Sequence, residues 1–529
     1  MGNKLELTWY GKEQEISVEP RLLIERAELS NTAAAPDTEN MLIHGDNLLA
    51  LKALESRYKG QVKCIYIDPP YNTGSAFEHY DDNLEHSEWL TLMRPRLEIL
   101  KNLLAEDGSI WISIDDDEQA YLKVICDEIF GRYNFVAQII WQKRTSPDMR
   151  LPISTAHDYI MIYAKSKDLF KPTINKLPLS PETATNYKNP DNDPRGLWTS
   201  TDCTAQAGHA TKEQFYDLIT PSGRVIKLPS DRCWRFTQKR MQEQIDDNRI
   251  WFGMDGNGVP RKKTFLSESK GMSAWTWWSN KEVGHNQEAK KEVIAFNKDS
   301  VFDTPKPERL IQRILLLASN KGDLVLDSFL GSGTTAAVAH KMGRRYIGIE
   351  MGEHAYTHCK KRLDMVVSGE DKGGISKAVD WKGGGGYRFY ELAPTLVNKD
   401  EFGEFVINPE YSADMLAAAM ALHEGYTYQP DSTVFWKQSH GSENAYLFVT
   451  TRHLNAAFMQ SIVGTMQENE SLVIACCSFD KGMEKMNPHI TVKKIPQMLL
   501  ERCEFDKSDY NLNIIHPPVY EDEEDCDEE

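Results

Sequence analysis

The feature that most constrains the fold is a strand–helix rhythm that begins near residue 41, stops near residue 165 and resumes near residue 306. Short apolar segments such as 62–67 and 109–114 are typical of buried strands, and segments with helical spacing of leucines lie between them. Parallel strands need a crossover connection, and the helix in that connection covers one face of the sheet. The rhythm therefore predicts an α/β fold with a doubly wound sheet that a long insertion divides into two parts.

The expected elements follow from the apolar segments and from the Gly, Pro and Asp residues that bound them. Expected strands cover residues 41–45, 62–67, 109–114, 135–141, 159–165, 323–329 and 344–350. Expected helices cover residues 46–58, 88–105, 115–130, 306–317 and 334–342. Pro95 is expected to interrupt the second helix, because proline removes a backbone donor.

The same pattern divides the chain into seven segments. We expect an N-terminal arm, a first part of the sheet, an inserted domain, a second part of the sheet, a Gly-rich linker, a mixed α/β C-terminal domain and an acidic tail. In that order the segments cover residues 1–40, 41–165, 166–300, 301–381, 382–390, 391–520 and 521–529. Insertions into a sheet of this kind often carry recognition, because they lie on the surface.

Charge is distributed unevenly along these segments. The whole chain has a formal net charge of −18, and its last nine residues hold eight carboxylates. The segment from Trp141 to Ser300 holds 25 Lys and Arg against 19 Asp and Glu, so its net charge is +6, and it contains seven of the twelve tryptophans. Cations that meet phosphates and aromatic rings that stack on bases are typical of nucleic-acid surfaces. The basic, Trp-rich segment is therefore a candidate surface for nucleic acid within an acidic protein.

Cysteine usage and hydropathy argue against several other classes of protein. The nine cysteines form no CxxC pair, which argues against a zinc site or a disulfide framework. The first residues contain no apolar stretch of the kind found in signal peptides, and no run of about 18 apolar residues occurs. We expect a cytoplasmic protein with reduced thiols, no metal and no membrane-spanning segment.

A Gly-rich turn follows the expected strand at 323–329. Gly331 and Gly333 allow a tight turn and a close approach to a ligand, and the helix after them presents free N–H groups. Asp327 precedes the turn, and Glu350 ends the next expected strand, where an acidic side chain can bind ribose hydroxyls. The pattern predicts a nucleoside site. It lacks the Gly-Lys-Ser/Thr of a Walker loop and only approximates a dinucleotide motif, so the nucleoside stays open at this point.

A second motif, Asp68-Pro69-Pro70-Tyr71, follows the expected strand at 62–67. The prolines remove two backbone donors, so nearby carbonyls are available to a ligand. A carboxylate, a carbonyl and an aromatic ring within four residues suit a planar base with an amino group. Asp68 and the Pro69 carbonyl would accept from the amine, and Tyr71 would stack on the ring.

Together these two motifs resemble those of the DNA amino-methyltransferases, in the permuted order in which the catalytic half precedes the cofactor half. Further segments are similar to the modification subunits of type III restriction systems, and they extend over nearly the whole chain. They include GDN at 45–47, DPPYNTG at 68–74, NPDNDPRG at 189–196, KPERLI at 306–311 and FLGSGTT at 329–335.

The resemblance implies a Rossmann-like methyltransferase fold, S-adenosylmethionine as cofactor and an adenine N6 amine in double-stranded DNA as target. It also implies base flipping, a target-recognition role for residues 166–300 and a possible dimerisation role for residues 391–520. The implied cofactor residues are Asp46, Lys306, Asp327, Phe329, Gly331, Gly333, Thr334 and Glu350. The implied catalytic residues are Asp68, Pro69, Pro70 and Tyr71.

Positive side chains in and beside the inserted domain are the candidates for contact with DNA. They are Arg144, Arg232, Arg235, Lys239, Arg240, Arg261, Lys262 and Lys263, with Trp275, Trp277 and Trp278 near them. His44 lies on the expected strand at 41–45, and His157 lies two residues before the expected strand at 159–165. Both are interpreted as structural.

Three alternatives stay open. A cytosine-N4 methyltransferase would use the same chemistry, because the motif at Asp68 fits any amine on a planar ring. Methylation of a glutamine side chain is a weaker rival, because Asn rather than Asp would be expected at position 68. The chain could also act mainly as a DNA-recognition subunit for a separate restriction nuclease and translocase, since its sequence contains no helicase Walker motif.

Overall fold

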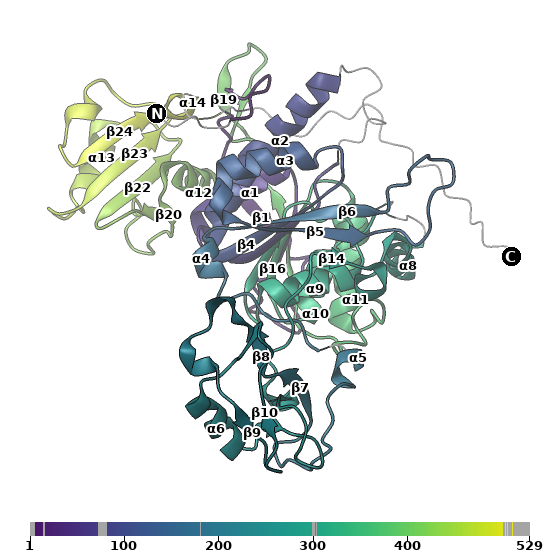
Figure 1. Cartoon of the computed structure of the whole chain (residues 1–529). Helices are drawn as coiled ribbons and strands as arrows, with labels where there is room; N and C mark the ends of the chain where they lie inside the picture. The colour runs from purple at the N-terminus through teal and green to yellow at the C-terminus, as the bar shows by residue number, and fades with distance from the viewer. Residues whose placement is uncertain are drawn as a thin grey trace. The chain divides into compact units, whose positions relative to one another are not determined.

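The computed structural model describes residues 6–13, 16–71, 82–179, 181–298, 302, 304–500, 503, 505 and 510. The chain forms two compact units (Figure 1). The larger unit combines Met1–Asn175 with Trp275–Glu529, and the smaller unit is Lys176–Ala274. The acidic tail expected at 521–529 lies outside the described residues.

A ten-stranded sheet forms the centre of the larger unit. Its strands, in spatial order, are β1 (Leu23–Glu25), β17 (Arg388–Leu392), β2 (Met41–His44), β16 (Arg345–Glu350), β15 (Leu324–Asp327), β3 (Val62–Ile67), β4 (Leu104–Ile114), β6 (His157–Ala164), β5 (Phe135–Gln142) and β14 (Trp277–Trp278). The strands from β17 to β4 run parallel, whereas β6 is antiparallel to both of its neighbours. The expected doubly wound α/β sheet is confirmed.

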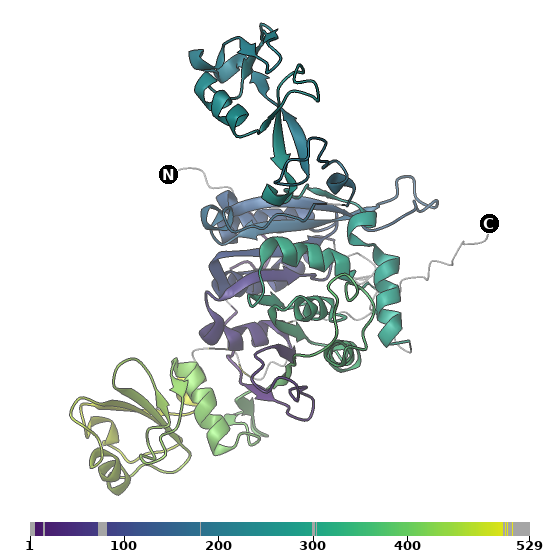
Figure 2. The ribbon, with the colours of Figure 1, turned by 90° about the horizontal axis from the view of Figure 1, so that it is seen from below.

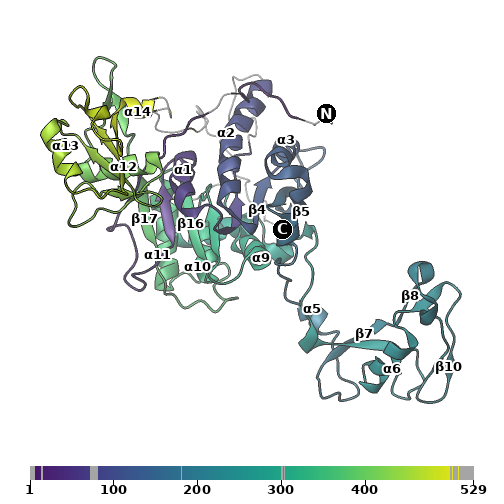
Figure 3. The same ribbon diagram turned by 90° about the vertical axis from the view of Figure 1, so that its left-hand side faces the viewer.

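Helices cover both faces of this sheet. One face carries α1 (Asn47–Tyr58), α2 (Asp82–Leu103) and α3 (Gln119–Cys126), and the other carries α9 (Glu308–Ala318), α10 (Thr334–Lys341) and α11 (Lys361–Ser368) (Figures 1 and 3). The main core forms where leucines of α1 and α2 pack on β2, β3 and β4. No helix among the described residues is both long enough and apolar enough to span a membrane.

The helix α2 differs from its expected form, because it starts before residue 88 and continues through Pro95. Proline inside a helix costs about 3 kcal/mol. Trp89, Met93 and Leu97 on the same helix are fully buried, and burial of large apolar side chains offsets that penalty. The expected interruption is therefore wrong. The expected helix at 115–130 is α3 followed by a π-helical turn, Asp127–Gly131.

The order of the strands brings distant segments together. β15 lies beside β3, and the two strands pair in parallel through Val325 with Cys64 and Leu326 with Ile65. On one side of this contact lie β3, β4, β6, β5 and β14, and on the other lie β15, β16, β2, β17 and β1. Ligands of open α/β sheets bind where the strand order reverses, at the carboxyl ends of the strands. The contact between β3 and β15 is such a place.

The Gly-rich segment does not simply separate two domains. Residues 388–392, which overlap the expected linker, form β17 and pair with β2 in the central sheet. A Cβ atom at Gly385 would lie 2.6 Å from Nε2 of His340, so the chain needs glycine there to pass the end of α10. Apolar spacing did not indicate β17, because Arg388 and Glu391 interrupt it.

The larger unit also contains a mixed five-stranded sheet near its C-terminus. Its strands are β20 (Thr427–Tyr428), β21 (Ser439–His440), β22 (Ala445–Thr450), β23 (Ser471–Cys476) and β24 (Ile490–Lys494). Before it, β18 (Val397–Lys399) and β19 (Phe405–Ile407) form a hairpin. The helix α12 (Ala413–Glu424) packs on the sheet, and α13 (Ala456–Val463) connects β22 and β23.

The smaller unit lies inside the segment expected as an insertion. Its largest sheet joins β12 (Ile250–Trp251), β13 (Arg261–Phe265) and β7 (Trp198–Asp202). The pairs β8 (Thr204–Gln206) with β11 (Arg232–Trp234) and β9 (Leu218–Ile219) with β10 (Val225–Ile226) complete its strands, and α6 (Gln238–Asp246) packs beside them. Cys203, Trp234 and Met241 belong to its core.

Candidate functional site

Asp68 lies directly after β3 and is held from two sides. The Tyr71 hydroxyl donates to Oδ1 of Asp68 at 2.8 Å, and Nζ of Lys306 donates to Oδ2 at 2.6 Å. The Asp68 side chain keeps 21% of its surface exposed, and that of Lys306 keeps 9%. Nζ of Lys306 also lies 5.1 Å from the centre of the Tyr71 ring. The sequence predicted Lys306 as a cofactor residue and Asp68 as a catalytic residue, and the structure brings the two into contact.

Tyr71 contributes its hydroxyl as well as its ring to this arrangement. Burial first, and then the charge of Asp68, raise the pKa of Tyr71 well above its usual value. The phenol is therefore neutral at physiological pH and can donate to Asp68. Pro69 is buried, and the indole N–H of Trp89 donates to the Pro70 carbonyl at 2.7 Å. Sequence reasoning missed this use of Trp89, which fixes the turn after β3.

The Gly-rich turn lies at the end of the neighbouring strand, β15. Gly331 and Gly333 have φ values of 56° and 81°, which side chains rarely adopt. The N–H of Gly331 donates to Glu350 at 2.7 Å, so Glu350 supports the turn from the end of β16. A Cβ atom at Gly331 would lie 3.0 Å from the ring of Phe302. Phe302 therefore packs against one side of the turn, and the backbone of the turn lies near the edge of the sheet.

Asp327 ends β15 and is buried. Its Oδ1 accepts from the Phe329 N–H at 2.9 Å, and Thr335 also hydrogen-bonds to the carboxylate. Burial raises the pKa of Asp327 to about 7, against the lowering effect of these hydrogen bonds. The charges of Asp68 and Glu350 raise it further, which indicates that the ends of β3 and β15 belong to one electrostatic site. Burial also raises the pKa of Glu350.

Asp46 has a structural role that the sequence did not predict. Its Oδ1 accepts from the N–H groups of Leu48 and Leu49 and caps α1, and its Oδ2 accepts from Tyr510 N at 3.0 Å. Nη2 of the buried Arg96 lies 3.4 Å from Oδ2. Both oxygens are occupied, so the expected cofactor contact of Asp46 would require these bonds to change.

Sequence reasoning also missed a buried ion network behind the turn. Nη1 of Arg362 donates to Oγ1 of Thr334 at 2.8 Å, and Nη2 donates to Glu308 at 2.8 Å. Glu308 also pairs with Lys341 at 2.8 Å. The network joins the first residues of α9 and α10, and so links the helix after Lys306 to the Gly-rich turn. No local pattern marks Arg362, because it lies on an ordinary amphipathic helix.

One buried polar atom in the turn has no protein partner among the described residues. Ser328 follows Asp327 and is 1% exposed, and its Oγ makes no hydrogen bond. Its carbonyl accepts from Nδ2 of Asn47 at 2.8 Å. A buried hydroxyl without a partner costs stability, so a ligand atom at this position would be favoured. Phe329, next in the chain, packs against the main core.

The basic side chains expected to contact DNA differ in accessibility. In the smaller unit Arg235, Lys239, Arg240 and Arg261 are exposed, and Arg232 and Lys262 are half-buried. Arg232 pairs with Asp202 at 2.9 Å, and Arg240 pairs with Glu243 at 2.6 Å. In the larger unit Arg144 follows β5, Trp275 and Trp277 are exposed, and Trp278 is buried.

Lys263 is buried, which contradicts its expected contact with DNA. It is 0% exposed, and its ammonium pairs with Asp191 and with Asp193. Alternate residues of a strand share a face, so Lys263 points inward together with the buried Phe265. A buried, neutralised ammonium cannot reach a phosphate, and its expected contact with DNA is wrong.

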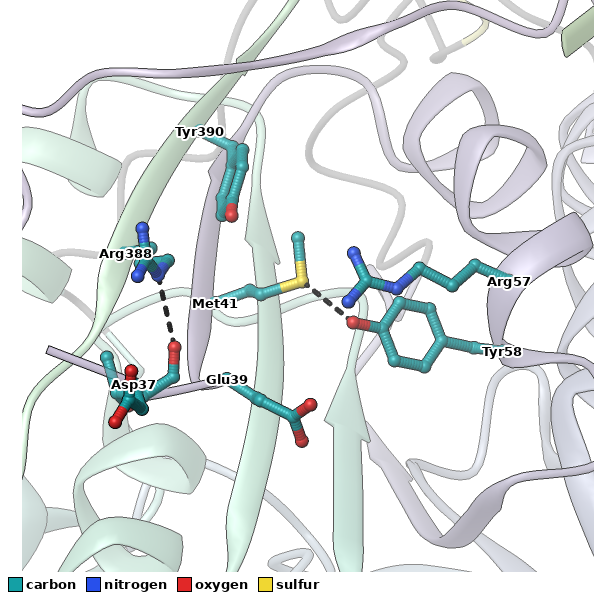
Figure 4. Close-up of a pocket in the computed structure, with 8 residues that line it drawn as sticks. Asp37, Glu39, Met41, Arg57, Tyr58, Arg388 and Tyr390 are labelled. Carbon is teal, nitrogen blue, oxygen red and sulfur yellow. Dashed lines mark hydrogen bonds between the residues drawn. The ribbon is translucent and has the colours of Figure 1, made fainter. Parts of the chain in front are cut away.

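A cavity of about 300 Å³ lies away from this site (Figure 4). Its lining includes Met41 and Arg388, which begin β2 and β17, together with Arg57, Tyr58 and Tyr390. The amino ends of parallel strands lie at the edge opposite to their carboxyl ends. The cavity therefore faces the other edge of the sheet from Asp68 and Asp327.

Comparison with known proteins gives similarities of sequence and of structure. A family model described as DNA methylase matches residues 62–361. The type III restriction-modification enzyme StyLTI Mod subunit of Salmonella typhimurium is 35% identical over 62% of this chain and 54% of its own length. The probable HindVI Mod subunit of Haemophilus influenzae is 32% identical over 69% of this chain and 56% of its own length. The chain thus spans about half the length of these two relatives.

Two further comparisons cover more of the matched protein. The EcoP15I Mod subunit of Escherichia coli is 26% identical over 79% of this chain and 77% of its own length. Among solved structures, a putative DNA modification methylase from Thermus thermophilus, complexed with S-adenosyl-L-methionine, covers 66% of this chain and 99% of its own, with 18% identity and a TM-score of 0.34.

Proposed function

We propose, from the premise that the chain belongs to the DNA methylase family, that it transfers a methyl group to the N6 amine of an adenine flipped out of double-stranded DNA. The observation that carries the proposal is the position of Asp68 at the end of β3, beside the Gly-rich turn at the end of β15. At this edge of the sheet, Asp68, which can accept hydrogen bonds from an amine, lies beside the predicted nucleoside site at the Gly-rich turn. The named Mod subunits among its relatives support a role as the modification subunit of a type III-like restriction-modification system.

The residues at the end of β15 fit S-adenosylmethionine as cofactor. The unpartnered Ser328 hydroxyl and the backbone of Gly331 and Gly333 offer polar contacts, and Asp327 offers a carboxylate to a positively charged ligand. Phe329, Thr334 and Glu350 would complete the site through the turn that they support. When bound, the cofactor supplies an electrophilic methyl group on a sulfonium sulfur.

The residues after β3 would act on the target amine. The lone pair of an exocyclic amine on a base is delocalised into the ring, so the amine is a weak nucleophile. The amine would donate hydrogen bonds to Asp68 and to the Pro69 carbonyl, which would localise that lone pair and orient it toward the methyl group. Asp68 would take the proton that the nitrogen gives up when it is methylated. Each Asp68 oxygen accepts one hydrogen bond in the structure and keeps a second lone pair, so the carboxylate can also accept from an amine. Tyr71 would stack on the base.

Recognition of the DNA sequence is proposed for the smaller unit. Its exposed cations, including Arg235, Lys239 and Arg261, suit phosphate contact, which fixes a protein on the duplex. A flipped base costs a few kcal/mol of lost stacking, and contacts elsewhere on the duplex must supply this energy. A restriction partner with helicase and nuclease activity, a homodimer formed through residues 391–520 and a cytoplasmic location are further parts of this proposal.

Sequencing that detects modified bases, applied to DNA from cells that express the chain, tests the proposal. We expect N6-methyladenine in one short sequence motif, and its loss in cells that express Asp68→Ala. The finding of N4-methylcytosine would overturn the assignment of the base, because the amine chemistry at Asp68 suits both bases. DNA without any new modification would overturn the proposed activity and would favour a recognition subunit, which copurification with a nuclease would detect.

A further inference from the structure

The loop between β5 and β6 leaves the sheet at the same edge as Asp68. Strand register establishes this, because Ile67 pairs with Ile112 and, two residues further along β4, Ile114 pairs with Tyr159 at the start of β6. Residues 143–156 form the loop, which extends past the sheet in two perpendicular views (Figures 1 and 2).

The base of the loop is tied to the candidate site. Nζ of Lys143 donates to Oδ1 of Asp158 at 2.6 Å, and Asp158 is buried in β6. Burial raises the pKa of Asp158, and the charges of Lys143, Lys306 and Asp68 also act on it. Lys143, the first residue of the loop, is therefore held close enough to Asp68 for their charges to interact with the same group. The loop thus begins beside the candidate site.

The tip of this loop, residues 148–154, exposes three large aliphatic side chains. Met149 is 88% exposed, Leu151 is 51% exposed and Ile153 is 89% exposed. Single apolar side chains on a surface are ordinary, but three within five residues of one projecting tip concentrate apolar surface in water. Burial of such a group against a partner is favourable.

The tip has an ordered backbone, which its hydrogen bonds maintain. The N–H of Asp148 donates to Oγ of Ser154 at 2.8 Å, and the N–H of Leu151 donates to the Asp148 carbonyl at 3.2 Å. Arg150 donates to both oxygens of Asp148, at 3.1 Å each, and so neutralises the carboxylate of the tip. Pro147 and Pro152 restrict φ beside these bonds. The apolar side chains are thus presented on a preordered turn, which loses little entropy on binding.

We propose that this tip is a wedge that enters the DNA duplex and fills the space left by the flipped base. The inference rests on the proposed function, because that function requires a duplex with one base removed from its stack at this edge of the sheet. Met, Leu, Ile and Pro are the side chains that other proteins insert between base steps, where they replace lost stacking.

The test compares the wild-type chain with a variant that carries Met149→Ser, Leu151→Ser and Ile153→Ser. The substrates are two synthetic duplexes with the motif found by sequencing, one fully paired and one with an abasic site opposite the target adenine. The abasic site removes most of the cost of flipping, so it makes a wedge unnecessary. We expect the variant to methylate the paired duplex at least about 10-fold more slowly, and the abasic duplex within about twofold of wild type.

A second readout follows the flipped base directly. With 2-aminopurine in place of the target adenine, fluorescence rises when the base leaves the stack, and we expect the variant to show a smaller rise on the paired duplex. Leu169→Ser is the matched control, because Leu169 is 49% exposed and follows the end of β6 that is farther from the loop. This control should methylate both duplexes as wild type does.

Two results would overturn the wedge. The first is a tip variant that methylates the paired duplex as fast as wild type. If that variant also fails to bind a restriction partner, the tip is a protein interface instead. The other is an equal loss on both duplexes in a variant that melts at the wild-type temperature, which would indicate a role other than base flipping. A wild-type chain that methylates neither duplex would instead overturn the proposed function, so the two failures are distinguishable.

Discussion

Two carboxylates at the ends of adjacent parallel strands have opposite environments. Asp68, after β3, is partly exposed and contacts an ammonium and a phenol. Asp327, at the end of β15, is buried, and among the described residues its recorded partners are neutral donors: the Phe329 N–H and Thr335. The same residue type at the ends of two neighbouring strands therefore serves two purposes. Partners of Asp68 can exchange with a substrate, whereas Asp327 is fixed and lacks a positive charge that a ligand could supply.

The difference indicates that Asp68 takes part in the chemistry of the site, whereas Asp327 maintains the shape of the site. A carboxylate that must accept protons from a ligand needs access and exchangeable partners. A carboxylate that shapes a turn needs fixed donors, and burial raises its pKa when no cation is present. If Asp68 and Asp327 differ in this way, substitution at Asp68 should have the largest effect on methyl transfer, and substitution at Asp327 should have the smallest effect, on cofactor affinity.

Replacement of Asp68 by Ala should have the largest effect. It removes the carboxylate acceptor of the amine protons, so methyl transfer should fall by about 10³-fold or more, as for other groups that accept protons in a reaction. Transfer of a labelled methyl group to DNA measures this effect. DNA binding, followed by gel shift, should be largely unchanged, because a carboxylate makes no contact with phosphate. Substantial remaining turnover would contradict the role assigned to Asp68.

Replacement of Lys306 by Met should have the next largest effect. The variant keeps most of the length of the side chain and removes the ammonium that lies 2.6 Å from Asp68. A hydrogen bond between charged groups contributes about 1.5–3 kcal/mol, so kcat/KM should fall about 10–100-fold. Lys306→Arg keeps the charge and is the control, with a smaller loss expected. A faster Lys306→Met variant would mean that the ammonium merely blocks Asp68.

Replacement of Gly331 by Val should weaken cofactor binding about 10-fold. Valine is strained at a φ of 56°, and its Cβ would press on the ring of Phe302, so the turn must shift. Calorimetric titration with S-adenosylmethionine measures the change. Gly322→Val is the matched control, because Gly322 has a φ of 82° with open space around it and lies at the other end of β15. Equal losses in both variants would show that general destabilisation, rather than the turn, lowers the affinity.

The sequence predicted the central strands well, because β3, β4 and β15 are apolar segments bounded by polar or turn residues. It did not predict β1, β14 or β17. These strands are short or carry charged residues such as Arg388, and they form because a neighbouring strand already offers its backbone groups. Propensity cannot reveal such strands, since their stability depends on tertiary pairing.

The candidate site was predictable where its residues are adjacent in sequence. Both strand-end motifs, at Asp68 and at Gly331, were found for this reason. The contact between Lys306 and Asp68 joins residues 238 positions apart, and no spacing rule reports it. The burial of Lys263 was predictable, because strand alternation places Lys263 on the same face as Phe265. The prediction of a DNA contact followed the basic run from Arg261 to Lys263 and did not use this alternation.

The smallest expected effect is a dependence of cofactor affinity on pH, which Asp327 should cause. Its pKa is raised to about 7, so about half of the free protein carries a protonated Asp327 at that pH. A cationic ligand favours the ionised carboxylate and lowers its pKa in the complex, so binding releases a proton. Affinity should therefore increase as pH rises, by about twofold from pH 7 to pH 8, until the carboxylate is ionised in the free protein as well.

Titration calorimetry in buffers of different ionisation enthalpy would count the protons released near pH 7. In Asp327→Asn the release and the twofold change should both disappear, whereas Lys306→Arg should keep them. An unchanged pH dependence in Asp327→Asn would assign the proton to another group, such as Glu350, whose pKa burial also raises. Asp68 and Asp327 would then differ only in their exposure to solvent and ligands, and Asp327 would have only a structural role.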